Sequence, residues 1–96
     1  MEQFPRHLLV AWARNEPRIR ALFVFGSRAE GRATVSSDLD LAVELTVPED
    51  EQLLTFLDNR QRWRADLQRV TGMRVKDLEL RGASTTAGGG VEVYRR

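Results

Sequence analysis

Hydrophobic positions at the start of the chain first follow a helical spacing and then form a continuous run. From Pro5 to Glu16 the apolar residues recur at a spacing that places them on one face of a helix. Pro5 suits a first helical turn and Pro17 cannot continue a helix, so both ends are marked. The run Ile19–Phe25 stops at Gly26 and does not alternate, which indicates a central strand covered on both faces.

The middle of the chain contains an alternating segment and a long helical pattern. In Asp38–Leu45 the leucines and the valine share one face of a predicted strand, and the acidic residues share the other. Pro48 opens a predicted helix that ends at Gly72, with acidic residues in its first turn as the helix dipole favours. The expected apolar stripe of this helix consists of Leu53, Phe56, Leu57, Trp63, Leu67 and Val70.

The last part of the chain completes a recognisable order of elements. Met73–Leu80 and Val91–Tyr94 are predicted strands, and the small, polar segment Ala83–Gly90 between them predicts a mobile loop. The resulting order of helices and strands is typical of an α/β (α+β) domain in which helices pack on a mixed β-sheet. With 96 residues, the chain is expected to form a single domain over residues 1–96.

Composition excludes several classes of function. The net charge of +1, from 15 basic and 14 acidic residues, gives no bulk signature of a nucleic-acid or membrane partner, so neither is expected. The absence of cysteine excludes disulfides and zinc–thiolate sites, and a single histidine, His7, excludes a multi-histidine metal site. No apolar run approaches a membrane span and the N-terminus does not resemble a signal peptide, which predicts a cytoplasmic protein. The predicted long helix carries four arginines, Arg60, Arg62, Arg64 and Arg69, and this pattern indicates a helix face exposed to solvent rather than a nucleic-acid-binding stripe.

A glycine turn directly after the first predicted strand is the first candidate for chemistry. In Gly26–Gly31 the backbone can approach a ligand closely, and the hydroxyl of Ser27 adds a hydrogen-bond donor, which suits a phosphate group. The spacing of the two glycines also resembles a P-loop. A P-loop requires lysine and then serine or threonine after the second glycine, and Arg32 and Ala33 stand there instead. The P-loop is therefore rejected.

A pair of aspartates opens the second predicted strand. Asp38 and Asp40 are two positions apart, about 6.6–6.8 Å along a strand, and so point in one direction. Two such carboxylates can hold divalent magnesium ions together with substrate phosphates. The alternative is an exposed polar face in which Arg28 or Arg32 balances the charge. Two roles remain open for Arg28, a contact with phosphate or an ion pair with Glu30 or the aspartates.

Together, these motifs resemble a known family. The stretch Phe25–Val43 is similar to the signature of the minimal nucleotidyltransferases, in the DNA polymerase β-like nucleotidyltransferase superfamily. The resemblance implies a polymerase β-like core in which Gly26 and Ser27 bind the phosphates of a nucleoside triphosphate. Arg28 is assigned to nucleotide binding with them, because an arginine fork suits a phosphate group. It also implies that Asp38 and Asp40 bind Mg²⁺.

The same resemblance implies a third carboxylate on a later strand, and two residues are candidates. Asp77 fits the family pattern best, and Val75, Asp77 and Glu79 are predicted to share one strand face. Asp77 is therefore assigned to metal binding and catalysis, ahead of Glu79. Lys76 replaces an apolar residue of the pattern, and a register shift by one position would place it where the acid belongs.

The function implied by the resemblance is Mg²⁺-dependent transfer of a nucleoside monophosphate, expected to be AMP from ATP, to an acceptor hydroxyl. Minimal nucleotidyltransferases are commonly paired with a small helical HEPN-domain toxin, which they modify as antitoxins. A chain this short would borrow its acceptor surface from such a partner or from another copy of itself in a homo-oligomer. The alternative is a catalytically impaired binding module that neutralises its partner by direct complex formation. Transfer to a small molecule is disfavoured, because the chain lacks an extra domain to hold one.

Overall fold

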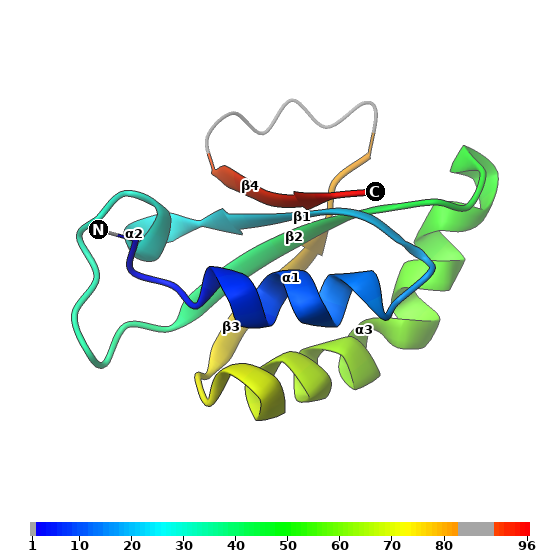
Figure 1. Cartoon of the computed structure of the whole chain (residues 1–96). Helices are drawn as coiled ribbons and strands as arrows, with labels where there is room; N and C mark the ends of the chain where they lie inside the picture. Colours follow the sequence, from blue (N-terminus) through cyan, green and yellow to red (C-terminus); the bar gives the residue numbers. More distant parts are fainter. Residues whose placement is uncertain (1, 83–89) are drawn as a thin grey trace.

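The computed structural model describes residues 2–82 and 90–96. Its elements are α1 (Arg6–Arg14), β1 (Ile19–Phe25), α2 (Gly26–Ala29), β2 (Leu39–Leu45), α3 (Glu49–Thr71), β3 (Val75–Leu80) and β4 (Val91–Arg95). Along the chain, helices and strands alternate up to β3, and a second strand, β4, follows it, as Figure 1 shows. No helix in this part of the chain is both long enough and apolar enough to cross a membrane.

The four strands form one sheet in the order β3-β2-β1-β4. β1 is antiparallel to both β2 and β4, whereas β2 and β3 run parallel. A parallel pair needs a crossover connection, and α3 supplies it between β2 and β3 (Figure 1). The α/β class with a mixed sheet, predicted from the order of elements, is confirmed.

The main core lies between the sheet and the two longer helices, α1 and α3. The alternating apolar residues of β2 all point into it and are at most 1% exposed: Leu39, Leu41, Val43 and Leu45. Trp12 of α1 and Trp63 of α3 meet edge to face, with ring centroids 6.5 Å apart. The buried indole N–H of Trp63 donates to Glu16 Oε1 at 3.0 Å. Its polar atom is therefore satisfied inside the core.

The opposite face of the sheet carries a smaller apolar cluster. Ala21, Phe23 and Ala42 are buried there, and Phe25 packs against them. The guanidinium of Arg81 lies 4.2 Å from the centre of the Phe23 ring, in a cation–π contact. β1 is thus covered on both faces, as its continuous apolar run predicts.

Predicted and observed element boundaries agree closely where the local signal is strong. β1 spans the residues predicted for it, and α3 ends at Thr71 because Gly72 adopts a left-handed conformation with φ of +69°. The N–H of Gly72 donates to the Gln68 carbonyl at 2.9 Å and completes this cap. Of the predicted loop Ala83–Gly90, all but Gly90 lies outside the described residues.

The predicted apolar stripe of α3 is wrong in its first half. Leu53 and Leu57 are 61% and 57% exposed, whereas Phe56, Trp63 and Leu67 are buried. In Figure 1 the first turns of α3 lie to one side of the strands, and of Leu53, Phe56 and Leu57 it is Phe56 that is buried. Helical spacing cannot show where a helix leaves the body of the protein.

Two of the α3 arginines also depart from the expected solvated face. Arg60 and Arg64 each donate through Nε to a carbonyl of β3, to Leu78 at 3.1 Å and to Val75 at 2.8 Å. Gln68 of the same helix accepts the N–H of Val75 at 3.0 Å. These bonds cover the outer edge of β3, which would otherwise be open to another strand. They also hold β3 in the position on which the candidate site depends.

Candidate functional site

The topology gathers the predicted site at one end of the sheet. Because β1 and β2 are antiparallel, Phe25 at the end of β1 pairs with Asp40 near the start of β2. Because β2 and β3 are parallel, Asp40 also pairs with Asp77. Gly26 follows Phe25 directly, so three segments far apart in sequence meet around Asp40.

A bulge in β3 places Asp77 there. Leu39 pairs with Val75 and Asp40 pairs with Asp77, so Lys76 is an extra residue without a counterpart on β2. Val75 faces the core and is fully buried, whereas Asp77 is exposed. The expectation that Val75 and Asp77 share one strand face is therefore wrong, because the bulge reverses the alternation. The same bulge keeps Lys76 out of the position opposite Asp40.

Gly26 and Asp40 are in close contact. Gly26 has φ of +70°, a conformation that side-chain-bearing residues rarely adopt. A Cβ atom at this position would lie 2.5 Å from Asp40 Oδ2. Both the backbone angle and the missing side chain are therefore required for the Asp40 carboxylate to lie against the start of α2.

Asp40 occupies an electrostatically unfavourable position. Its Oδ1 atom is buried and has no hydrogen-bond partner among the described residues. Burial raises the pKa of Asp40, and the negative charges of Asp77 and Asp38 raise it further, while Lys76 acts in the opposite direction. A cation placed between these carboxylates would relieve both the unpaired oxygen and the mutual repulsion.

Asp38 lies just before β2 and is partly exposed. Its Oδ2 atom is 3.8 Å from Arg74 Nη1, a long ion pair at the surface. Carboxylate oxygens are the ligands that Mg²⁺ prefers, so the chemistry of Asp38, Asp40 and Asp77 fits a divalent ion. Across residues 2–82 and 90–96, no three acidic or histidine side chains are already arranged as a complete metal cage. The site is thus a group of acids around Asp40 rather than a preformed cage.

Arg28 is engaged with backbone carbonyls. Its Nε and Nη2 atoms donate to the Ser37 carbonyl at 3.0 and 2.6 Å, and Nη1 donates to the Gln3 carbonyl at 2.8 Å. Glu30 forms its ion pair with Arg32 instead. The ion pair between Arg28 and Glu30, left open by the sequence, is not formed. No pattern in the sequence points to Gln3, which motif reasoning missed.

The other candidates differ in their distance from Asp40. Ser27 stands in the first turn of α2, where backbone N–H groups have no partner within the helix. Glu79 is exposed and pairs with Ala42, two positions farther along β2 than Asp40. The structure therefore brings Asp77, and not Glu79, to Gly26 and Asp40.

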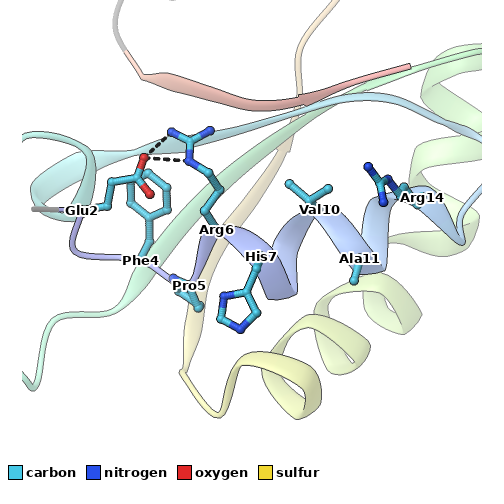
Figure 2. A pocket seen from close by; sticks show the side chains of 8 residues that line it. All are labelled: Glu2, Phe4, Pro5, Arg6, His7, Val10, Ala11 and Arg14. Atoms are coloured by element: carbon cyan, nitrogen blue, oxygen red, sulfur yellow. Dashed lines mark hydrogen bonds and ion pairs between the residues drawn. The ribbon is translucent and has the colours of Figure 1, made fainter.

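A hollow of about 730 Å³ lies elsewhere, along α1. Figure 2 shows its lining, which includes Phe4, Pro5, Val10 and Ala11, with Arg6 bonded to Glu2 at its rim. None of the predicted site residues lines it. His7, at this hollow, is exposed.

Comparison with known proteins identifies the fold. The family model described as Polymerase beta, Nucleotidyltransferase matches residues 9–86. No curated protein matches the chain. A crystal structure of a toxin–antitoxin with AMP-PNP is similar, with a TM-score of 0.69 and 23% identity over 95% of this chain and 73% of that chain. A second, of the toxin–antitoxin MntA–HpeT with two Asp→Glu changes, has a TM-score of 0.69 and 20% identity over 96% of this chain and 74% of that chain.

Proposed function

The chain belongs to the polymerase β nucleotidyltransferase family, and we propose that it transfers a nucleoside monophosphate from a nucleoside triphosphate to an acceptor hydroxyl. The observation that carries this proposal is the position of Asp40. Its carboxylate lies against Gly26, its backbone is paired with that of Asp77 in the neighbouring strand, and its buried Oδ1 atom has no hydrogen-bond partner in the described structure.

The triphosphate binds at the turn between β1 and α2. Gly26 has no side chain to obstruct a phosphate group, and Ser27 offers its hydroxyl and a backbone N–H in the first turn of α2. This turn directly adjoins Asp40, so a bound triphosphate would lie beside the acidic residues. This position beside Asp40 supports the assignment of Gly26 and Ser27 as nucleotide-binding residues.

Asp38, Asp40 and Asp77 would hold Mg²⁺. When bound, Mg²⁺ neutralises phosphate charge and lowers the pKa of a hydroxyl that it contacts. Without such a cation, three carboxylates beside a triphosphate would repel the substrate. The pKa of Asp40 is raised, first by its burial and then by the negative charge of Asp77, so its ionised form is disfavoured when no cation is bound.

The transfer itself is a substitution at phosphorus. The acceptor oxygen forms a bond to the α-phosphorus, the bond between that phosphorus and the bridging oxygen of the β-phosphate breaks, and pyrophosphate leaves. Asp77 is exposed and adjacent to Asp40, so it can receive the proton of the acceptor hydroxyl. Ser27 and the neighbouring backbone hold the leaving phosphates in line.

We further propose that the nucleotide is ATP and that the acceptor is a HEPN-type toxin protein. One similar structure is a toxin–antitoxin that contains AMP-PNP, and the similarity extends over 95% of this chain. In the second similar structure the two Asp→Glu changes are two positions apart, the spacing of Asp38 and Asp40. The acceptor surface would then come from the partner or from another copy of this chain.

A second candidate, a binding module without activity, is favoured by one observation. The ammonium group of Lys76 is close enough to lower the pKa of Asp40 and so offsets part of the acidic charge without a metal ion. Such a protein would neutralise its partner by covering it. The two candidate functions differ in whether Asp38 and Asp40 are required to neutralise the partner.

Label transfer tests the proposal. Purified protein, Mg²⁺ and α-labelled ATP are mixed with lysate of the host cell, in parallel with an Asp38→Asn/Asp40→Asn double variant. A macromolecule labelled by the wild type alone supports nucleotidyl transfer and identifies the acceptor. Equal neutralisation of the partner by both proteins, without label, supports the binding module.

A further inference from the structure

The guanidinium of Arg28 connects three segments of backbone. It projects from α2 and donates to the carbonyls of Ser37, Gln3 and Thr34, the last at 3.4 Å. All three of its nitrogen atoms take part in these bonds. α2 is therefore fastened to the end of the loop that leads into β2.

A second anchor holds the same loop. The side chain of Gln3 donates to the Ala33 carbonyl at 3.2 Å and accepts the Ala33 N–H at 2.7 Å. Inside the loop, the N–H of Ser37 donates to the Thr34 carbonyl at 3.0 Å, and the Ser37 hydroxyl accepts the Thr34 N–H at 2.9 Å. Residues 33–37 thus form a turn that is fixed from two directions.

Asp38 follows this turn immediately. On its other side, Leu39 is fully buried and donates its N–H to the Arg74 carbonyl at 2.8 Å. The backbone of Asp38 is therefore held at both ends, by Arg28 through Ser37 and by the start of β2. Among residues 2–82 and 90–96, the one ion pair of the partly exposed Asp38 side chain is the long contact with Arg74.

We propose that Arg28 is a positioning residue, which sets the distance between the Gly26–Ala29 turn and the carboxylate of Asp38. The inference rests on the proposed function, in which that turn binds phosphate and Asp38 binds Mg²⁺. Arg28 acts through the Ser37 carbonyl and does not itself touch the nucleotide. Lysine cannot replace it, because a single ammonium group lacks the fork that reaches three carbonyls at once.

Three variants separate this role from a direct contact with phosphate. Arg28→Lys keeps the positive charge and removes the fork. Gln3→Ala removes the second anchor of the same turn and carries no charge that a phosphate could use. Arg32→Gln is the matched control, an exposed arginine of the same segment whose side chain forms an ion pair with Glu30. Thermal unfolding shows that each variant is folded before it is compared.

The first readout needs no activity. Hydrogen exchange at the amides of residues 33–37 and the affinity for Mn²⁺ alone are measured on nucleotide-free protein. Both Arg28→Lys and Gln3→Ala are expected to speed exchange and to weaken Mn²⁺ binding about tenfold, the size of loss typical when the support of a metal ligand is removed. Arg32→Gln should match the wild type. Failure of the wild type to bind Mn²⁺, or unchanged exchange and affinity in both variants, overturns the inference.

The second readout is label transfer at varied Mg²⁺ and ATP. The positioning role predicts a higher half-saturating Mg²⁺ concentration for Arg28→Lys and Gln3→Ala, with an unchanged KM for ATP at saturating Mg²⁺. A different result would show that Arg28 contacts phosphate directly and would overturn the positioning role. In that result, Arg28→Lys has a raised KM for ATP and unchanged hydrogen exchange, and Gln3→Ala has the kinetics of the wild type. A wild type that binds Mn²⁺ but transfers no label refutes the proposed function, and the first readout still decides the role of Arg28.

Discussion

Gly26 and Asp40 lie so close together that a Cβ atom on Gly26 would be 2.5 Å from Asp40 Oδ2. Gly26 begins α2 directly after β1, and Asp40 lies near the start of β2. Their contact joins the proposed phosphate-binding turn to the proposed metal-binding carboxylate. Any side chain at Gly26 must displace one of them. This contact can therefore be tested by the smallest possible substitution.

Replacing Gly26 with alanine should cost both stability and activity. Gly31→Ala is the matched control, because Gly31 also has positive φ, +75°, but has open space where a Cβ would stand. Each variant should lose roughly 1–2 kcal/mol to the left-handed backbone. Gly26→Ala should lose more, and its transfer rate should fall about a hundredfold as Asp40 moves. Chemical unfolding and label transfer measure both effects, and equal losses in the two variants would contradict the contact's role.

Local signals in the sequence were sufficient for most of the fold. The alternation of Leu39–Leu45 fixes which face of β2 is buried, and Gly72 marks the end of α3 because a left-handed cap needs glycine. The glycine turn that follows β1 and the Asp38–Asp40 pair at the start of β2 likewise fall within 15 residues of sequence, from Gly26 to Asp40. These features depend on neighbours in the chain, so a single sequence contains them.

Features that depend on distant partners could not be predicted. The bulge at Lys76 is held by Arg64 and Gln68 of α3, and it decides that Asp77 stands beside Asp40. The anchoring of Arg28 depends on Gln3, 25 residues away. In both cases the sequence shows which residue type is present, but its hydrogen-bond partner depends on how distant elements pack together.

Asp77 should be required for transfer, whereas Glu79 should not. Asp77 pairs with Asp40 across β2 and β3, and Glu79 pairs with Ala42 farther along. Asp77→Asn is expected to lower the transfer rate by at least ~100-fold, since it removes the proposed proton acceptor. Glu79→Gln, an equal change of charge on the same strand, should stay near the wild type. If only Glu79→Gln lost transfer activity, Glu79 and not Asp77 would be the third acid.

Asp40→Asn should stabilise the metal-free protein at neutral pH. Burial, followed by the charge of Asp77, raises the pKa of Asp40, so the folded state binds the proton more tightly than the unfolded state. The stability that this proton provides is present at pH below the ordinary carboxyl range, near 4, and is lost as pH rises through the raised pKa. Thermal unfolding with a chelator should therefore show Asp40→Asn gaining on the wild type as pH rises from 4 to 8. A difference that does not change with pH would contradict this assignment.

Mg²⁺ should reverse that order. At a hundred times its Kd, a ligand that binds only the folded state stabilises it by about 2.7 kcal/mol. The Tm of the wild type should rise accordingly, whereas Asp40→Asn and Asp77→Asn should rise little. Glu79→Gln, with Glu79 placed away from Asp40, should behave like the wild type. An equal rise in all four proteins would show that Mg²⁺ binds elsewhere.

The most direct measurement compares ATP labelled at the α-phosphate with ATP labelled at the γ-phosphate, using the wild type and the Asp38→Asn/Asp40→Asn variant. Nucleotidyl transfer with pyrophosphate as the leaving group predicts that the wild type transfers only the α-label to a protein acceptor and that the variant transfers neither. Transfer of the γ-label, or equal α-labelling by the variant, would contradict the assignment of Asp38 and Asp40 to nucleotidyl transfer.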